Sequence, residues 1–120
     1  MSQISTPQDG LTRSRRRGNS RATVRYRCAP ATIGRLYVGN DHEFQHAWVL
    51  NLSQSGVGFF LARPVTAGLP VIIQMRAGES GDVHELCANV VHCTAQLTGE
   101  WLVGCEFIQP LPVEILDSLL

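Results

Sequence analysis

The chain has 120 residues, 44% of them hydrophobic, which suits a single domain with one ordinary core and a tail. No apolar run approaches the roughly 20 residues of a membrane helix, and Met1 to Gly10 lacks the apolar run of a signal peptide, so we expect a cytoplasmic protein without a membrane span. The net charge is zero, yet residues 1–35 carry eight arginines and one acid (+7), and the remaining 85 residues carry two arginines and nine acids (−7).

The N-terminal segment is an arginine-rich arm. Residues 1 to about 20 have only Ile4 and Leu11 as sizeable apolar residues, so they cannot bury enough surface to fold. We place the boundary so that residues 1–15 are a disordered, flexible arm and residues 16–120 form one domain. All ten basic residues of the chain are arginine, which favours forked recognition of phosphates or guanine edges over the diffuse charge of lysine.

Short strands are predicted beyond the arm. From Ala22 to Cys28, apolar residues alternate with arginines, as in a strand with one wet face, and Pro30 interrupts this strand. Apolar runs bounded by Gly, Pro and Asn predict further strands over Thr32–Val38, Ala47–Leu52, Val57–Ala62, Val71–Met75, Leu86–Cys93 and Trp101–Phe107. The large aromatic residues of these strands, Trp48, Phe59, Phe60 and Trp101, are expected in the core.

The alternation over residues 86–93 assigns two faces to that strand. It places His92 on the face of Leu86 and Val90, and Cys87 and Cys93 on the opposite face. The cysteines of the chain, Cys28, Cys87, Cys93 and Cys105, include no CxxC pair, and without an export signal they argue against a disulfide framework. We therefore expect buried free thiols with a packing role.

Only the last segment is predicted to be helical. In Pro112–Leu120, proline stands at a first helical position, and Ile115, Leu116, Leu119 and Leu120 follow at spacings of three and four. We expect this helix to pack across the open end of a barrel. Six or seven short strands separated by Gly and Pro indicate an all-β fold, an antiparallel barrel or sandwich, with a C-terminal helix.

The first functional motif is an RxxxR spacing formed by Arg17 and Arg21. Arg13 and Arg17, and also Arg21 and Arg25, have the same spacing, so position has to decide among the three pairs. Arg17 and Arg21 lie just before the first strand, where they can close over the barrel when a dianion supplies the attraction. A solvated basic arm without a specific ligand is the alternative.

The second motif is Asn51-Leu52-Ser53-Gln54-Ser55-Gly56, an NxSxxG pattern between two predicted strands. The Asn51 amide offers a donor and an acceptor that match a guanine edge, and the Ser53 hydroxyl adds an adaptable hydrogen bond. Gly56 permits a positive φ or a close backbone approach. The alternative is a plain β-turn, in which the same residue types are common.

Together with the closing strand Trp101-Leu102-Val103-Gly104-Cys105-Glu106-Phe107, the two motifs make residues 13–120 resemble the PilZ domain family. The NxSxxG motif follows Arg21 by about thirty residues, in the order that the family shows. The resemblance implies a six-stranded antiparallel PilZ-like β-barrel with a terminal helix. It also implies that cyclic di-GMP binds between the arginine arm and the NxSxxG turn, with no cofactor besides that ligand.

The resemblance also implies the roles of individual residues. Arg17 and Arg21 would fork onto the phosphates and guanine Hoogsteen edges of the ligand while stacking on its rings. Asn51 and Ser53 would take a guanine edge, and Gly56 would shape the turn.

One position beside the first motif and one within the second bear on stoichiometry and affinity. Arg16 immediately precedes the first motif, and in the family a basic residue there is associated with an intercalated pair of ligands in one site. Asn51 stands where many members have Asp, so the chain gives up a charge-assisted hydrogen bond to guanine. We expect that exchange to lower the affinity somewhat.

Other function classes fit the sequence less well. The acids and the four histidines, His42, His46, His84 and His92, are scattered, so neither an active site nor a metal site is indicated. A small RNA- or single-strand-binding barrel is disfavoured because residues 36–120 are acidic and lack a row of aromatic residues alternating with basic ones. A PilZ-like adaptor that acts without ligand remains an alternative.

The expected mechanism is an electrostatic switch. Ligand draws the positive arm onto the barrel and creates an ordered surface. Because the chain shows no second domain, we expect an effector protein in trans, a homodimer or both to carry the signal onward.

Overall fold

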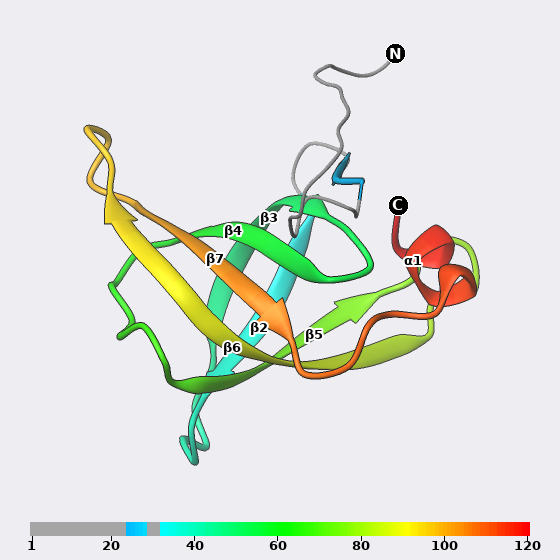
Figure 1. Cartoon of the computed structure of the whole chain (residues 1–120), viewed down its shortest axis with the longest axis horizontal. Coiled ribbons are helices and arrows are strands. Elements are labelled where there is room, and N and C mark those ends of the chain that lie inside the picture. The colour runs from blue at the N-terminus through cyan, green and yellow to red at the C-terminus, as the bar shows by residue number, and fades with distance from the viewer. Residues whose placement is uncertain (1–23, 29–31) are drawn as a thin grey trace, which may run out of the picture.

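Seven strands precede one helix in the computed structural model, which describes residues 24–28 and 32–120 (Figure 1). The elements are β1 (Tyr26–Arg27), β2 (Ile33–Val38), β3 (Gln45–Leu52), β4 (Gly56–Leu61), β5 (Pro70–Arg76), β6 (Val83–Ala95), β7 (Trp101–Phe107) and α1 (Val113–Leu119). Every predicted strand has a counterpart. The bounds of β7 agree with the prediction at both ends.

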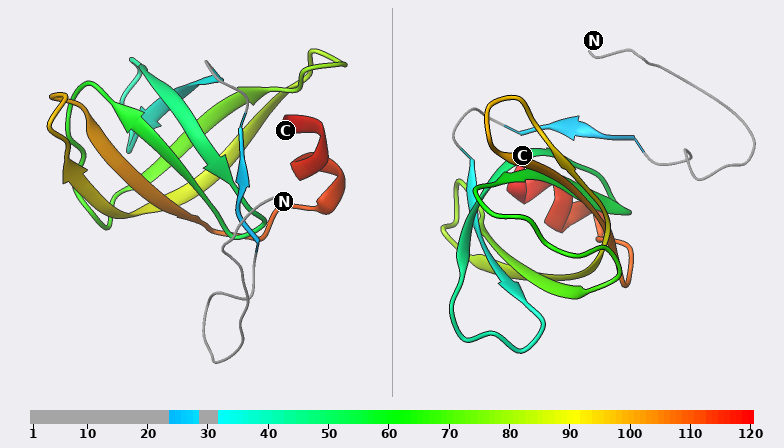
Figure 2. Two further views of the ribbon diagram at one scale, coloured as in Figure 1. Left: turned by 90° about the horizontal axis from the view of Figure 1, so that it is seen from above. Right: turned by 90° about the vertical axis from the view of Figure 1, so that its left-hand side faces the viewer.

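Six of these strands close into a barrel. They pair in the order β3, β2, β5, β6, β7, β4, and β4 pairs again with β3. All the pairings are antiparallel. Figure 2 (right) looks through this ring. The short β1 lies outside the ring and pairs with the last residues of β3, which β2 does not reach. The predicted six-stranded antiparallel barrel with a C-terminal helix is confirmed.

Apolar side chains that alternate along the strands fill the inside of the barrel. In β5, for example, Val71, Ile73 and Met75 are buried while the residues between them are not. The largest fully buried side chains are those of Phe59, Leu36, Leu52, Leu61, Ile73 and Met75. The prediction of a core position was wrong for Trp48, which is 40% exposed, and for Phe60, which pairs with Trp48 on the outer face. The neighbours of Trp48, Ala47 and Val49, point inward, so Trp48 points outward.

The helix covers one end of the barrel (Figure 2, left). Pro112 precedes its first turn, where a missing backbone N–H costs nothing, and Leu116 and Leu119 join the barrel core. Among the described residues, no helix has the length and hydropathy needed to span a bilayer. The backbone N–H of Leu111 donates to the Gln54 carbonyl (2.8 Å), and Gln54 Nε2 donates to the Leu111 carbonyl (3.1 Å). The approach to α1 is thereby tied to the β3–β4 turn.

Two β-bulges interrupt the alternation of the barrel strands. The register of β3 shifts between Val49 and Asn51, and that of β6 shifts between Val90 and His92. A bulge inserts one extra residue, so the side chains beyond it change faces. Asn51 consequently pairs with Gly58, an outward position of β4.

The bulge in β6 corrects the predicted faces of that strand. Leu86 and Val90 point inward, but His92 pairs with Gly104 on the outer face and is exposed. Cys93 pairs with the buried Val103 and packs against the core instead of facing away from it. One inserted residue therefore exchanges the expected positions of the histidine and the cysteine.

The cysteines are free, as expected, but their burial differs. Cys105 is buried, Cys28 and Cys93 are partly buried, and Cys87 is exposed, so the prediction of burial was wrong for Cys87. Burial, with a smaller contribution from the nearby Cys93, raises the pKa of the Cys105 thiol to about 12. Burial also raises the pKa of the Cys28 thiol to about 11. Because the thiolate is the reactive form, Cys28 and Cys105 behave as packing residues.

Candidate ligand-binding site

The NxSxxG motif forms the tight turn between β3 and β4, and Ser53 organises it. The Ser53 side chain is fully buried. Its Oγ accepts hydrogen bonds from the backbone N–H groups of Ser55 (3.2 Å) and Gly56 (3.1 Å), and the Ser53 N–H donates to the Gly56 carbonyl (2.9 Å). In this conformation the hydroxyl therefore supports the turn from within, and its predicted contact with a guanine edge stays a prediction.

Replacing Ser53 with alanine should lower the free energy of unfolding by about 2 kcal/mol, because two backbone donors lose their acceptor in a largely buried turn. Urea unfolding followed by circular dichroism measures this change. Ser80→Ala is the matched control, since Ser80 Oγ also accepts from a backbone N–H (that of Asp82, 3.2 Å) but in an exposed loop. Equal losses in the two variants would contradict the role assigned to Ser53.

Gly56 is required for a close approach of two strands. It pairs with Glu106 of β7, and a Cβ atom built on it would overlap the carbonyl oxygen of Cys105. Its φ is not among the positive ones, which belong to Gly39, Gly68, Gly81 and Gly99. Of the two roles that the sequence allowed, the structure shows the close backbone approach.

Asn51 lies on the outer face of the barrel and is held by an arginine. A Cβ atom on Gly58 would lie 3.0 Å from Asn51 Oδ1, so the amide sits directly over this glycine. Arg25 Nη1 donates to the same Oδ1 at 2.9 Å. The absence of a side chain on Gly58 thus leaves room for the amide, and a guanidinium is already placed beside it.

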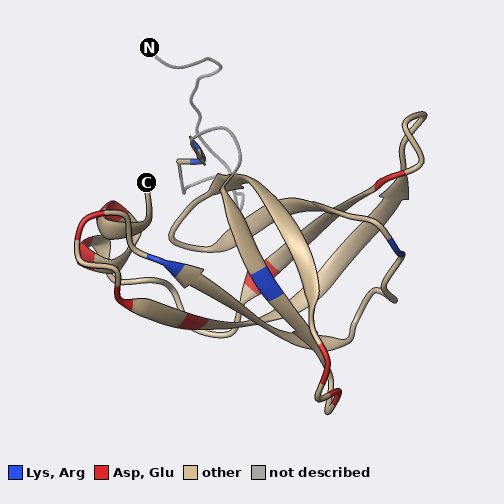
Figure 3. Ribbon diagram, turned by 180° about the vertical axis from the view of Figure 1, so that it is seen from behind, with Lys and Arg blue, Asp and Glu red and all other residues tan. Residues whose placement is uncertain are grey.

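The arginines next to Asn51 come from β1 and its approach. Arg27 pairs with Asn51 across the β1–β3 ladder, and both Arg25 and Arg27 are exposed. In Figure 3 this basic segment is separated from the acidic residues, which lie on the helix and in several loops. The sequence had placed Arg25 on the solvent-facing side of a strand and had not indicated it as a site residue. The signal that could have identified Arg25 is the RxxxR spacing that it forms with Arg21.

The structure brings together part of the predicted site. Asn51 lies near the end of β3, Ser53 lies in the β3–β4 turn, and Gly56 begins β4. The remaining predicted residues, Arg16, Arg17 and Arg21, lie outside the described residues.

An outward-facing apolar row borders the site. Ile33 of β2 pairs with Trp48, Trp48 with Phe60 of β4, and Phe60 with Leu102 of β7. Ile33 is 47% and Trp48 is 40% exposed. Side chains directly opposite one another in paired strands lie on one face, so these four form a continuous strip. It runs one outward position along the strands from the Asn51–Gly58 pair.

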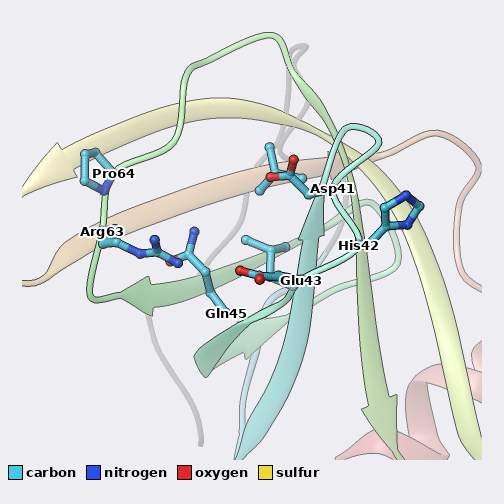
Figure 4. A pocket seen from close by; sticks show the side chains of 8 residues that line it. Asp41, His42, Glu43, Gln45, Arg63 and Pro64 are labelled. Atoms are coloured by element: carbon cyan, nitrogen blue, oxygen red, sulfur yellow. The ribbon is translucent and has the colours of Figure 1, made fainter.

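A separate open pocket lies at the other end of β3, around the β2–β3 turn (Figure 4). Its lining comprises Leu36, Val38, Asp41, His42, Glu43, Gln45, Arg63 and Pro64. Two carboxylates against a single guanidinium disfavour a polyanionic ligand there. Within the described ranges, no group of three His, Cys, Asp or Glu side chains is arranged so that it could hold a metal ion.

Comparisons with known proteins agree with this fold. A family model described as PilZ domain matches residues 15–120. Among solved structures, the PilZ domain with c-di-GMP of YcgR from Escherichia coli is similar at a TM-score of 0.64 and 16% identity, over 83% of this chain and 86% of that chain. The Bacillus subtilis inhibitor of motility (MotI/DgrA) has a TM-score of 0.60 and 16% identity, over 87% of this chain and 50% of that chain. At this identity the likeness shows a shared fold. No curated protein sequence matches the chain.

Proposed function

We propose that this chain, which belongs to the PilZ domain family, is a sensor that binds cyclic di-GMP on the outer face of its barrel beside the β3–β4 turn. It acts as a binding module and not as an enzyme. The observation that carries the proposal is the hydrogen bond from Arg25 to Asn51, which joins a cationic fork and an amide on an exposed surface. The description of the similar YcgR structure as a PilZ domain with c-di-GMP supports the choice of ligand.

The chemistry of the ligand matches this surface. Cyclic di-GMP carries two negative phosphodiesters and two guanine bases, each with a flat face and a hydrogen-bonding edge. Guanidinium groups bind phosphate and the guanine O6/N7 edge in a forked geometry. The Asn51 amide accepts from guanine N–H groups through Oδ1 and donates through Nδ2. Because Arg25 occupies Oδ1 in this structure, we expect the ligand to share or displace that hydrogen bond.

The arginines ahead of β1 complete the proposed site. Arg21 precedes Arg25 by four residues, so their Cα atoms are at most about 14 Å apart whatever the intervening conformation. Arg17 is eight residues away, which allows at most about 29 Å, and Arg16 one residue more. We propose that Arg17 and Arg21 contact the phosphates and guanine rings. Arg16 would support a second, intercalated ligand.

The proposed output is a surface that a partner protein recognises. Ligand neutralises the positive arm and holds it on the barrel. The resulting surface is recognised by an effector protein in trans, by a second copy of the chain in a homodimer, or by both. The similar B. subtilis protein is described as an inhibitor of motility, and this description favours a regulatory output for this chain as well.

The proposal is tested by calorimetric titration of the full chain with cyclic di-GMP, with GMP and a short single-stranded RNA as controls. Saturable binding of cyclic di-GMP alone is the expected result, and the fitted stoichiometry decides between one and two ligands. Binding of RNA instead would favour the nucleic-acid alternative. Binding of none of the three would favour a ligand-independent adaptor.

The same titration tests which part of the arm matters. Arg21→Ala should weaken cyclic di-GMP binding about tenfold or more, because a charge-assisted fork beside the site is lost. Arg13→Ala removes the same charge farther from β1 and should change Kd less than about threefold. Equal effects would show that the arm acts through its total charge and would contradict the assigned contacts.

A further inference from the structure

We propose that His92 is a further ligand-contacting residue, which closes the far side of the site by stacking its imidazole on a guanine of cyclic di-GMP. This inference rests on the proposed function. It extends the site from the β3–β4 turn across β7 to β6, to a residue that belongs to neither sequence motif. The strands concerned are neighbours in the barrel (Figure 1).

One registered row of residues links His92 to the site. Arg27 pairs with Asn51, Asn51 with Gly58, Gly58 with Gly104, and Gly104 with His92. All five are outward positions of β1, β3, β4, β7 and β6 respectively. The bulges in β3 and β6 place Asn51 and His92 in this row, since each would otherwise follow the inward-pointing residue two positions earlier.

The middle of the row is a floor of two glycines covered from both sides. A Cβ atom on Gly104 would overlap the His92 imidazole, just as one on Gly58 would contact the Asn51 amide. Both planar groups therefore lie over the floor. Gly58 and Gly104 are directly opposite each other, and such residues in an antiparallel pair have Cα atoms about 5 Å apart. The imidazole over Gly104 and the amide over Gly58 are therefore neighbours.

This arrangement fits the two recognition surfaces of a guanine. His92 is exposed although its ring covers Gly104, so part of the ring is accessible from outside the barrel. In the proposed complex a base stacks on this accessible part of the ring and turns its edge toward the Asn51 amide. The apolar strip that contains Phe60 and Leu102 lies alongside and offers further contact for the ring. One flat base is thus bound through its face and its edge.

The competing explanation is that the imidazole only covers a glycine in the strand next to it, which is a structural role. The two roles predict different effects of substitution. A phenyl ring at position 92 keeps both the cover and the stacking surface, whereas alanine removes both. A purely structural role would lower stability in His92→Ala and leave the affinity for ligand unchanged.

The test is calorimetric titration of the full chain with cyclic di-GMP for the wild type, His92→Ala, His92→Phe and His46→Ala. His92→Ala should raise Kd about tenfold, the usual loss when a base loses its stacking partner, and His92→Phe should stay within about threefold of the wild type. His46→Ala is the matched control because His46 is exposed at the opposite end of β3, and its Kd should not change. The His92 Cε1 proton should shift upfield in the NMR spectrum on ligand addition, under the ring current of a stacked base.

The possible failures are distinguishable. A wild type that does not bind cyclic di-GMP overturns the proposed function and this inference with it. A wild type that binds, with His92→Ala binding equally well, overturns only the role of His92. His92→Phe as weak as His92→Ala also overturns stacking.

Discussion

Replacing Gly56 with alanine is expected to lower the free energy of unfolding by about 3 kcal/mol, at the upper end of the usual cost of overpacking. The added Cβ atom would overlap the Cys105 carbonyl, which belongs to the backbone of β7 and cannot rotate away as a side chain can. Relief requires β4 and β7 to separate where they pair at Gly56 and Glu106. Urea unfolding followed by circular dichroism measures the loss.

The control for this prediction is Gly78→Ala. A Cβ atom on Gly78 meets nothing within 4 Å, and this glycine is not among those with positive φ, so its replacement should change the free energy of unfolding by less than about 0.5 kcal/mol. Comparable stability of the Gly56→Ala variant and the wild type would show that the strands adjust easily. The close-approach explanation of the final motif glycine would then be wrong.

Replacing Arg25 with alanine is expected to weaken cyclic di-GMP binding about 30-fold, which corresponds to the loss of one or two hydrogen bonds that involve a charged group. Arg25 is the described arginine whose guanidinium already donates to Asn51, at 2.9 Å. Its loss removes a phosphate or guanine contact and also leaves the Asn51 amide without the group that orients it. The Kd from calorimetric titration is the measurement.

Two further variants sharpen this prediction. Arg25→Lys keeps the charge but not the planar fork, so it should recover only a small part of the affinity. Arg35→Ala is the matched control, since Arg35 is an exposed strand arginine whose guanidinium lies over the Phe44 ring, 4.8 Å from its centroid, away from the turn. If Arg35→Ala weakens binding as much as Arg25→Ala does, the site responds to overall charge and the assignment of Arg25 is wrong.

The strands and the helix were predictable because their signals are local. Apolar residues alternate along β5 and β7, and Gly and Pro mark the turns between strands, so the element order follows from neighbouring residues alone. Trp48 shows the limit of that reasoning. Its size suggested a core position, but the inward places of β3 on either side of it are taken by Ala47 and Val49.

The NxSxxG segment was correctly predicted to be a turn between two strands, while the contacts that its residues make in the protein needed the fold. The burial of Ser53 and its two accepted hydrogen bonds follow from the closed conformation of the turn, which its composition does not specify. The constraint on Gly56 comes from β7, about fifty residues later in the chain. A pattern of neighbouring residues does not predict that β7 lies beside Gly56.

The amino-acid sequence by itself determined the all-β class, the order of strands and helix, the place of the NxSxxG turn and the family resemblance, because alternation, turn chemistry and motif spacing are properties of short segments. Only the tertiary structure decided which side chains share the outer face. Arg25, Asn51 and His92 are far apart in the sequence. Arg25 directly precedes β1, which pairs with β3, and barrel closure joins β3 through β4 and β7 to β6, the strand of His92. The two bulges then turn Asn51 and His92 outward. A bulge depends on how a strand fits its partner across the ladder, and that fit exists only once the barrel is formed.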